Sequence, residues 1–316
     1  SYTAFPGLHE SPSPDRPLID AKVDGRIDVS HQTRIELQGR FRLSTEDPNS
    51  PNLPAGLQVL PISIAGGVSA GVAHAFNRFE LGLKGSYDRI IYAPSHLTDG
   101  EVISNDDRNY DQYGLKLRGA YELMPGVKPF VELGGDTRIH DLPVDSAGFR
   151  RDSVAAVASV GSTMEFSRQL TGAVSIGYAQ RNYQDPNLTD LVGIVADGLL
   201  IWEATPLTKV TLTARSTVEE STLAGVSGVL QRDFGIQIDH SFRRWLIGTL
   251  KFGYGNSDYV GSTRDDQRWL VGGQLTYKMS RELWLKGEIR REWQTSNALG
   301  GDYAANIFLL GIRLQR

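Results

Sequence analysis

The stretch "TRIELQGRFRL", residues 33–43, alternates between two kinds of side chain with a period of two. Successive side chains of a β-strand point to opposite faces of a sheet, so this period predicts a strand with one apolar and one polar face. The apolar face would carry Ile35, Leu37, Gly39, Phe41 and Leu43, and the polar face Arg34, Glu36, Gln38, Arg40 and Arg42. Long charged side chains along a whole face indicate that this face meets water.

The same division recurs from residue 21 to the end of the chain. Clear examples are "AKVDGRIDVS" (21–30), "NRFELGLKGSYD" (77–88), "QYGLKLRGAYEL" (112–123), "TKVTLTARSTVE" (208–219) and "RELWLKGEIRREW" (281–293). Gly, Ala, Ser and Val blur the pattern near 62–72, 152–166 and 191–203, and the faces there stay unassigned. The sequence predicts roughly fifteen strands, more than an open sheet usually holds without curling, splitting or flattening. Closure into an all-β, up-and-down antiparallel barrel would also remove the exposed edges that invite aggregation.

The connections between these segments alternate between short and long. The short ones lie at 30–34, 75–79, 123–129, 166–170, 204–209, 240–244 and 278–282, and the long, polar ones at 44–61, 92–109, 140–151, 181–190, 219–228, 258–266 and 296–302. Barrels of the bacterial outer membrane show this asymmetry, with short turns in the periplasm and long loops outside the cell. We therefore predict a transmembrane β-barrel of the bacterial outer membrane, in contact with lipid and lipopolysaccharide. The residues expected to face lipid include Leu37, Leu117, Leu212 and Leu285.

Aromatic residues cluster toward the ends of the predicted strands, as the two aromatic girdles of a membrane barrel would. Those near short turns are Phe76, Phe79, Phe166, Trp202, Phe242, Trp245 and Trp284, and those near long loops are Tyr92, Tyr110, Tyr183, Tyr259 and Trp293. The alternative is a soluble all-β protein, such as a propeller or a sandwich. The charged face of strand after strand, the two loop lengths and the lack of a repeat of about 40 residues argue against it.

The composition excludes several classes of protein. The chain has 316 residues, a formal net charge of −4 and no cysteine. Near balance of the charges argues against a nucleic-acid partner, which usually needs a basic patch. The absence of cysteine removes disulfides, thiolate nucleophiles and Cys-ligated metals. The longest apolar run, "GLLIWEA" at 198–204, is far shorter than the roughly 20 residues of a membrane helix.

We expect residues 1–316 to form a single barrel domain. Counting fifteen strands back from a C-terminal strand that ends in the periplasm leaves Asp20 outside the cell, and single-chain bacterial barrels have an even number of strands. Residues 1–20 are therefore expected to be an extracellular segment leading into the first complete strand. At least one further strand is expected upstream, which would give 16 or 18 strands in the full protein.

Several segments resemble, in order and spacing, the putative β-barrel porin type 2 family of outer-membrane proteins. They are "AFNRFELGLKGSYD" (75–88), "SNDDRNYDQYGLKLRGAYEL" (104–123), "RNYQDPNLTDLVG" (181–193), "ATPLTKVTLTA" (204–214) and "TVEESTLAGVSG" (217–228). The resemblance covers most of residues 21–316 and carries no catalytic motif. Members of the family are often associated with exopolysaccharide or capsule export. The resemblance therefore implies an outer-membrane conduit that works with a periplasmic polysaccharide-export protein. One departure is the C-terminal "IRLQR" (312–316), which lacks the terminal Phe common among such barrels.

No catalytic residue, cofactor or metal site is predicted. The six histidines are scattered, without metal-ligand spacing on one strand face, and Asp106 and Asp107 fit a solvated loop better than a Ca²⁺ site. The candidate functional surface is the polar face, which would line a water-filled lumen in a barrel of 16 or more strands. Its predicted basic residues are Arg26, Arg34, Arg40, Arg42, Lys84, Lys116, Arg118, Arg138, Lys209, Arg215, Lys251, Lys286 and Arg290. Its predicted acidic residues are Asp24, Asp28, Glu36, Glu80, Asp88, Glu122, Glu132, Asp136, Glu219, Glu288 and Glu292.

Two interpretations of these charges stay open. In the structural one, opposite charges on neighbouring strands pair and are solvated. In the functional one, a modest excess of Arg and Lys attracts an anionic solute. The leading hypothesis is a non-enzymatic conduit for a hydrophilic exopolysaccharide, with an acidic polymer included among the candidates. A general diffusion porin would be told apart by pore width and by a loop folded inward. An outer-membrane hydrolase would need a catalytic cluster at the rim, and a structural anchor would have a plugged lumen.

Overall fold

The structure is a computed structural model that describes residues 2–3, 16–46, 52–54, 56–166, 169–219, 221, 223, 225–298 and 301–314. Apart from one short 3-10 helix, η1 (Asp106–Arg108), all regular structure in these residues is β. They contain fifteen long strands, as the sequence predicts. These are β2 (Arg16–Asp28), β3 (Thr33–Thr45), β4 (Ile62–Phe76), β5 (Phe79–Tyr92), β8 (Tyr110–Tyr121), β9 (Val127–His140), β10 (Ser153–Phe166), β11 (Leu170–Tyr183), β12 (Leu191–Thr205), β13 (Thr208–Glu219), β14 (Gly228–Arg243), β15 (Leu246–Val260), β16 (Asp265–Lys278), β17 (Leu283–Ser296) and β18 (Tyr303–Leu314).

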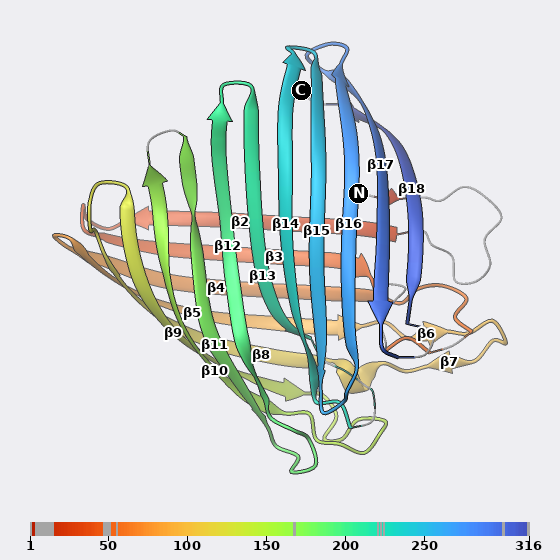
Figure 1. Ribbon diagram of the computed structural model, residues 1–316. Coiled ribbons are helices and arrows are strands. Elements are labelled where there is room, and N and C mark those ends of the chain that lie inside the picture. The colour runs from red at the N-terminus through yellow and green to blue at the C-terminus, as the bar shows by residue number, and fades with distance from the viewer. Residues whose placement is uncertain are drawn as a thin grey trace.

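The long strands form one antiparallel sheet in which each strand pairs with its neighbours in the chain. A short strand, β1 (Tyr2–Thr3), forms one edge beside β2, and β18 forms the other edge of the described sheet. The two-residue strands β6 (Ser95–His96) and β7 (Val102–Ile103) pair with each other in the connection between β5 and β8. Figure 1 shows the sheet curving so that β2 to β5 run behind β12 to β17 and cross them, as tilted strands on opposite walls of a barrel do. The predicted up-and-down antiparallel order is confirmed.

The first long strand begins earlier than expected. Residues 16–20 belong to β2, because Ile19 and Ala21 continue its apolar face and Asp20 lies opposite Arg42 of β3. The expected leading segment therefore cannot extend to residue 20. Most of the rest of that segment, residues 1 and 4–15, lies outside the described residues, and its extracellular location stays a prediction.

The two ends of the sheet differ in their connections. At one end the strands join through short turns, such as residues 77–78 and 206–207, and at the other through longer segments, such as 141–152 and 184–190. Asn77 has a φ of 58°, the left-handed conformation that a two-residue hairpin turn needs and that Asn tolerates. We call these two ends the short-turn end and the long-loop end.

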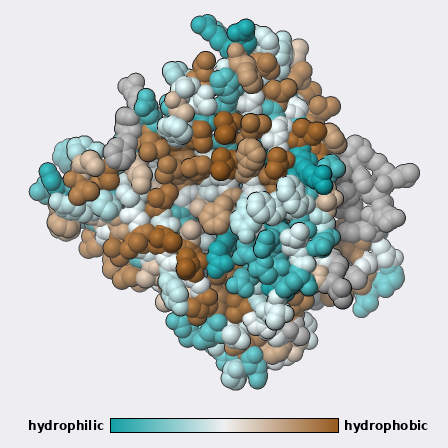
Figure 2. All heavy atoms as spheres, in the orientation of Figure 1, coloured by the Kyte–Doolittle hydropathy of each residue, from teal (hydrophilic) through white to brown (hydrophobic). Residues whose placement is uncertain are grey.

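No second layer covers the apolar face of the described sheet. Leu37 and Leu117, for example, are 45% and 42% exposed, whereas a sandwich would bury such side chains between its sheets. Figure 2 shows hydrophobic side chains gathered across the upper middle of this view, with hydrophilic ones at the top of the molecule. An exposed apolar face of this kind is suited to contact with lipid tails.

The aromatic girdle predicted near the long loops is wrong for Tyr92, Tyr110, Tyr183 and Tyr259. The strand register places all four on the polar face, where Tyr110 and Tyr259 are buried. Arginine side chains account for three of these positions, since Arg108 lies over the ring of Tyr92, Arg138 over Tyr110 and Arg264 over Tyr259. Trp284, expected in the other girdle, is also on the polar face, below Lys278 and Arg313. Aromatic residues that do face outward include Tyr87, Tyr113, Tyr178, Phe234, Tyr254, Trp269 and Trp293.

Candidate functional site

The strand register places the predicted charged residues on one face. The pairings continue this face without a change from Arg34 through Lys84 and Lys116 to Lys251. The other predicted residues lie on the same face of their own strands, with one exception. Glu122 is the exception, because it follows β8 directly and lies outside a strand. The polar face also holds charged residues that were not predicted, although the same alternation would have found them: Lys128, Arg181, Asp197, Asp233, Asp239 and Arg268.

Small side chains on β4 allow charged side chains to meet across it. Arg40 on β3 reaches over Gly67 to Asp88 on β5, and its Nε and Nη2 donate to the two carboxylate oxygens at 2.8 and 2.5 Å. A Cβ atom on Gly67 would overlap the Asp88 carboxylate. Glycine at this position therefore makes room for a bidentate ion pair that spans three strands.

Ion pairs are frequent elsewhere on the polar face. Arg34 donates to Glu80 at 2.5 Å across β4 and to Glu36 on its own strand at 2.8 Å. Further pairs join Arg26 to Asp28, Lys116 to Glu132, Arg181 to Asp136, Lys209 to Asp239, Lys251 to Glu288, and Arg290 to Glu288 and Glu292. For these residues the geometry supports the structural interpretation of the charges.

Three adjoining hollows follow the polar face from the short-turn end to the long-loop end. The first, of about 660 Å³, reaches Lys128 and Glu165 beside the short turns. The second, of about 350 Å³, lies at mid-height, and the third, of about 300 Å³, reaches Arg181 near the long loops. Lys116 and Glu132 line all three, so the hollows adjoin one another and form a path along the polar face of the sheet.

At the long-loop end of this path, β13 separates from β12 while it stays paired with β14. Residues 191–196 of β12 have no pairing partner on β13. Arg232 of β14 fills the space beside them and donates from Nε to the Ile194 carbonyl at 2.9 Å. The displaced end of β13 instead contacts β9, where Arg138 Nη2 donates to the Val218 carbonyl at 3.0 Å. Since β10, β11 and β12 separate β9 from β13 in the sheet, residues 216–218 must lie over the polar face.

Buried arginines attach this part of the chain, which we call the inward segment (residues 216–219, 221, 223 and 225–228). Arg151 is only 4% exposed, and its Nη1 donates to the Val226 carbonyl at 2.6 Å while its Nε donates to Asp145 at 2.7 Å. Val226 also packs with Val229 and Tyr259 in a small buried apolar cluster. The inward segment therefore narrows the third hollow and is held by both polar and apolar contacts.

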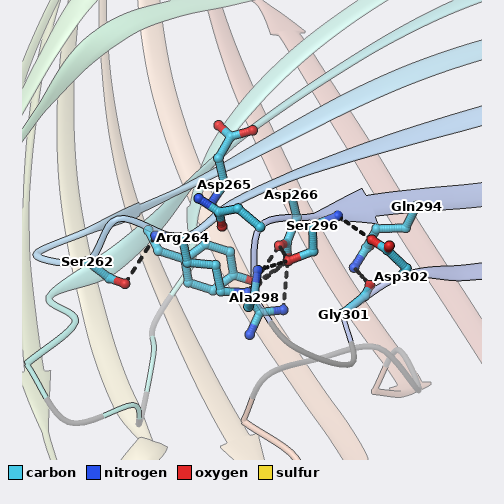
Figure 3. A network of polar contacts seen from close by, with 11 residues as sticks. Ser262, Arg264, Asp265, Asp266, Gln294, Ser296, Ala298, Gly301 and Asp302 are labelled. Carbon is cyan, nitrogen blue, oxygen red and sulfur yellow. Dashed lines mark hydrogen bonds and ion pairs between the residues drawn. The ribbon is translucent and has the colours of Figure 1, made fainter.

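A second polar network holds the neighbouring connections in place. Figure 3 shows Asp266 at its centre, accepting hydrogen bonds from Arg264 and Ser296. The Tyr259 hydroxyl also donates to Asp266, at 2.9 Å. Because Tyr259 packs against Val226, this network supports the inward segment from the side of β15 and β16.

Beyond the strand ends, two carboxylates have perturbed acidities. Arg89 donates from Nη1 and Nη2 to Asp141 at 2.6 and 2.5 Å, and these hydrogen bonds lower the pKa of Asp141. Backbone N–H groups of Arg150 and Asn187 lower the pKa of Asp185 in the same way. Both carboxylates stabilise the long-loop end in their ionised form.

Neither a metal site nor a membrane-spanning helix is found where the structure describes the chain. No three His, Asp or Glu side chains of these residues gather as metal ligands. No helix formed by these residues is long and apolar enough to span a membrane.

An apolar exterior, a polar interior face and connections of two lengths together characterise an outer-membrane barrel. Residues 2–316 match the sequence pattern of a family described as putative beta-barrel porin 2. The chain belongs to this family. The resemblance inferred from the sequence is thus confirmed, and the porin is a β-barrel protein of the bacterial outer membrane.

A solved structure supports the fold. Pseudomonas aeruginosa FpvA bound to heterologous pyoverdines is 7% identical, with a TM-score of 0.50 over 90% of this chain and 50% of that one. The unliganded ferric citrate transporter FecA is 9% identical, with a TM-score of 0.49 over 94% of this chain and 55% of that one. The porin therefore spans about half the length of these proteins. A bacterial polysaccharide outer membrane secretin is 13% identical, with coverages of 96% and 92% and a TM-score of 0.41. At 7% identity, the likeness to FpvA concerns the fold alone. No curated protein sequence matches the chain significantly.

Proposed function

We propose that this porin is a passive conduit through which a hydrophilic exopolysaccharide crosses the outer membrane. The observation that carries the proposal is the path of three adjoining hollows on the polar face. A single small ligand would need one closed pocket, whereas an extended polar chain needs a succession of polar surfaces along its length. Hydroxyl groups of a sugar can exchange hydrogen bonds with the charged and amide side chains at each level.

The polar face is, in this proposal, the lining of the lumen. Short turns of outer-membrane barrels are periplasmic, so the first hollow would be the entrance and the inward segment would lie near the extracellular exit. A periplasmic polysaccharide-export protein would then dock at the short-turn end and deliver the polymer. The family resemblance supports this partner.

A general diffusion porin for small solutes is the second candidate. The inward segment favours it, because a segment folded over the polar face narrows the path that a polymer would take. The two candidates differ in whether the constriction admits a chain of sugars or excludes it.

Deletion of the gene tests the two candidates in the same cells. The conduit predicts a loss of surface polysaccharide, measured on washed cells, with small-solute uptake nearly unchanged. A loss of small-solute uptake with normal surface polysaccharide would replace the conduit by the diffusion porin. Complementation with the wild-type gene is the control for effects on neighbouring genes.

A further inference from the structure

The first hollow contains cations that its acidic residues do not neutralise. Six basic and four acidic side chains line it. Lys84 on β5 and Lys116 on β8 are direct cross-strand partners, an arrangement that is normally destabilising for like charges. Lys116 is compensated by Glu132, whose carboxylate lies 2.8 Å from its Nζ. Among the described residues, no carboxylate lies within 4.0 Å of Lys84.

Arg118 lies in the same hollow and is held without an ion pair. Its Cζ lies 3.7 Å from the ring centroid of Phe130, and its Nη2 donates to Thr163 Oγ1 at 2.8 Å. The acid directly opposite on β9, Glu132, pairs with Lys116 instead. The ring and the hydroxyl fix the guanidinium, while Nε and Nη1 make no hydrogen bond to any described residue. Arg118 is therefore a positioned cation with free donors.

We propose that Lys84 and Arg118 form a subsite for an anionic group, a carboxylate, phosphate or sulfate, on a sugar residue of the translocated polymer. A planar guanidinium on an aromatic ring presents a fork that matches such groups, and a neighbouring ammonium adds charge. The hollow, at about 660 Å³, has the size of a small-molecule site. An anion bound here would also relieve the repulsion between Lys84 and Lys116. The proposal rests on the proposed function, because it assigns the chemistry of the conduit's substrate.

The test uses the full-length protein purified from outer membranes and inserted in a planar bilayer at moderate salt. An acidic oligogalacturonate and a neutral malto-oligosaccharide of equal length are added on the short-turn side, and the duration of each current interruption is measured. We expect acidic interruptions to last roughly tenfold longer, as charge-assisted hydrogen bonds imply. Lys84→Gln with Arg118→Gln should shorten them to the neutral duration.

A matched control removes the same charge from elsewhere on the polar face. Arg42 and Arg215 line none of the three hollows, so Arg42→Gln with Arg215→Gln should keep the longer acidic interruptions. Equal shortening in both double variants would reduce the effect to general electrostatics and overturn the subsite. Heat-modifiable migration in gels confirms that each variant is folded, and Lys84→Arg, which keeps the charge, should behave as wild type.

Further outcomes separate the subsite from the conduit. If neither oligosaccharide interrupts the wild-type current, the conduit itself fails. If both interrupt it for equal times, the conduit stands and the subsite is wrong. Inorganic phosphate, sulfate and acetate are then added singly as competitors. Shortening by at least one of them supports the anion subsite and ranks the three groups, and shortening by none contradicts it.

Discussion

Arginine has different roles at the two ends of the polar face. In the first hollow, near the short turns, Arg34 and Arg118 stay partly exposed and interact with carboxylates, a hydroxyl and an aromatic ring. Near the long loops, Arg138 and Arg151 are buried and donate to backbone carbonyls of the inward segment. The comparison shows that the same residue type can stay partly hydrated or hold a backbone segment in place, depending on what it faces.

The difference follows from the partner and its solvation. A partly exposed guanidinium keeps much of its hydration, so its ion pairs contribute little to stability and its donors can exchange partners. A buried guanidinium has lost that hydration and must have its donors satisfied by fixed groups. Carbonyl groups that leave a sheet ladder need donors as well. Arginine, with five N–H donors in a rigid fork, can serve a carboxylate and a carbonyl together, as Arg151 does.

The largest effect is expected when a buried arginine that holds the inward segment is replaced. Arg151→Gln leaves the buried carboxylate of Asp145 without its cation and the Val226 carbonyl without its donor. Loss of one partner of a buried pair typically costs about 3 to 5 kcal/mol. We expect the inward segment to detach from the polar face. Single-channel conductance should rise, and a protease site introduced at residues 223–226 should become easier to cleave.

Arg150 provides the control for this variant. Its side chain is exposed, and only its backbone N–H takes part in the local hydrogen bonds, by donating to Asp185. Arg150→Gln should therefore leave conductance and cleavage unchanged. Wild-type conductance in Arg151→Gln, with an unchanged unfolding midpoint in urea, would show that Arg151 does not hold the inward segment.

An intermediate effect is expected at Gly67, which lies beneath the ion pair between the exposed Arg40 and Asp88. Gly67→Ala places a Cβ atom on the Asp88 carboxylate and must displace its pair with Arg40. Overpacking of this kind usually costs about 1 to 3 kcal/mol. The neighbouring Gly66 points to the apolar face, and a Cβ there meets no atom within 4 Å, so Gly66→Ala is the matched control. Equal unfolding midpoints for the two alanine variants would contradict the three-strand ion pair.

Much of the fold could be predicted because its signal is local. The alternation of apolar and polar side chains depends only on one strand and on what its two faces contact. A stretch such as 33–43 therefore predicts both the strand and the side chains on each face. The contrast of short and long connections is likewise visible in the sequence and gives the order of the strands. The start of β2 at Arg16 was missed because Leu18 falls on the polar side and interrupts the alternation that Ile19 and Asp20 continue.

The parts that could not be predicted depend on which strands meet. Lys84 and Lys116 are 32 positions apart, and only the register shows that they face each other. The inward segment follows from contacts between β9 and β13, which no local pattern encodes. Tyr110 and Tyr259 were expected at the lipid interface since a tyrosine near a strand end suits both sides of the wall. Buried arginines decide the matter by packing on the rings from inside.

The smallest effect is expected from a change of pH, which acts on Asp141 at the long-loop end. Its partner Arg89 lies on the apolar face, opposite the buried arginines. The hydrogen bonds from Arg89 lower the pKa of Asp141, so its ionised form is favoured by folding. The resulting stabilisation is complete above the unfolded pKa, about 3.9, and is lost as pH falls through the lower folded pKa. Because both side chains are about one-third exposed, it should stay below about 1 kcal/mol. Urea midpoints of wild type and Asp141→Asn should therefore differ at pH 6 and converge toward pH 2. Arg89→Gln removes the hydrogen bonds that lower this pKa, so it should reduce the dependence of the urea midpoint on pH in the same way. A difference between wild type and Asp141→Asn that persists at pH 2 would show that Asp141 acts through something other than its charge.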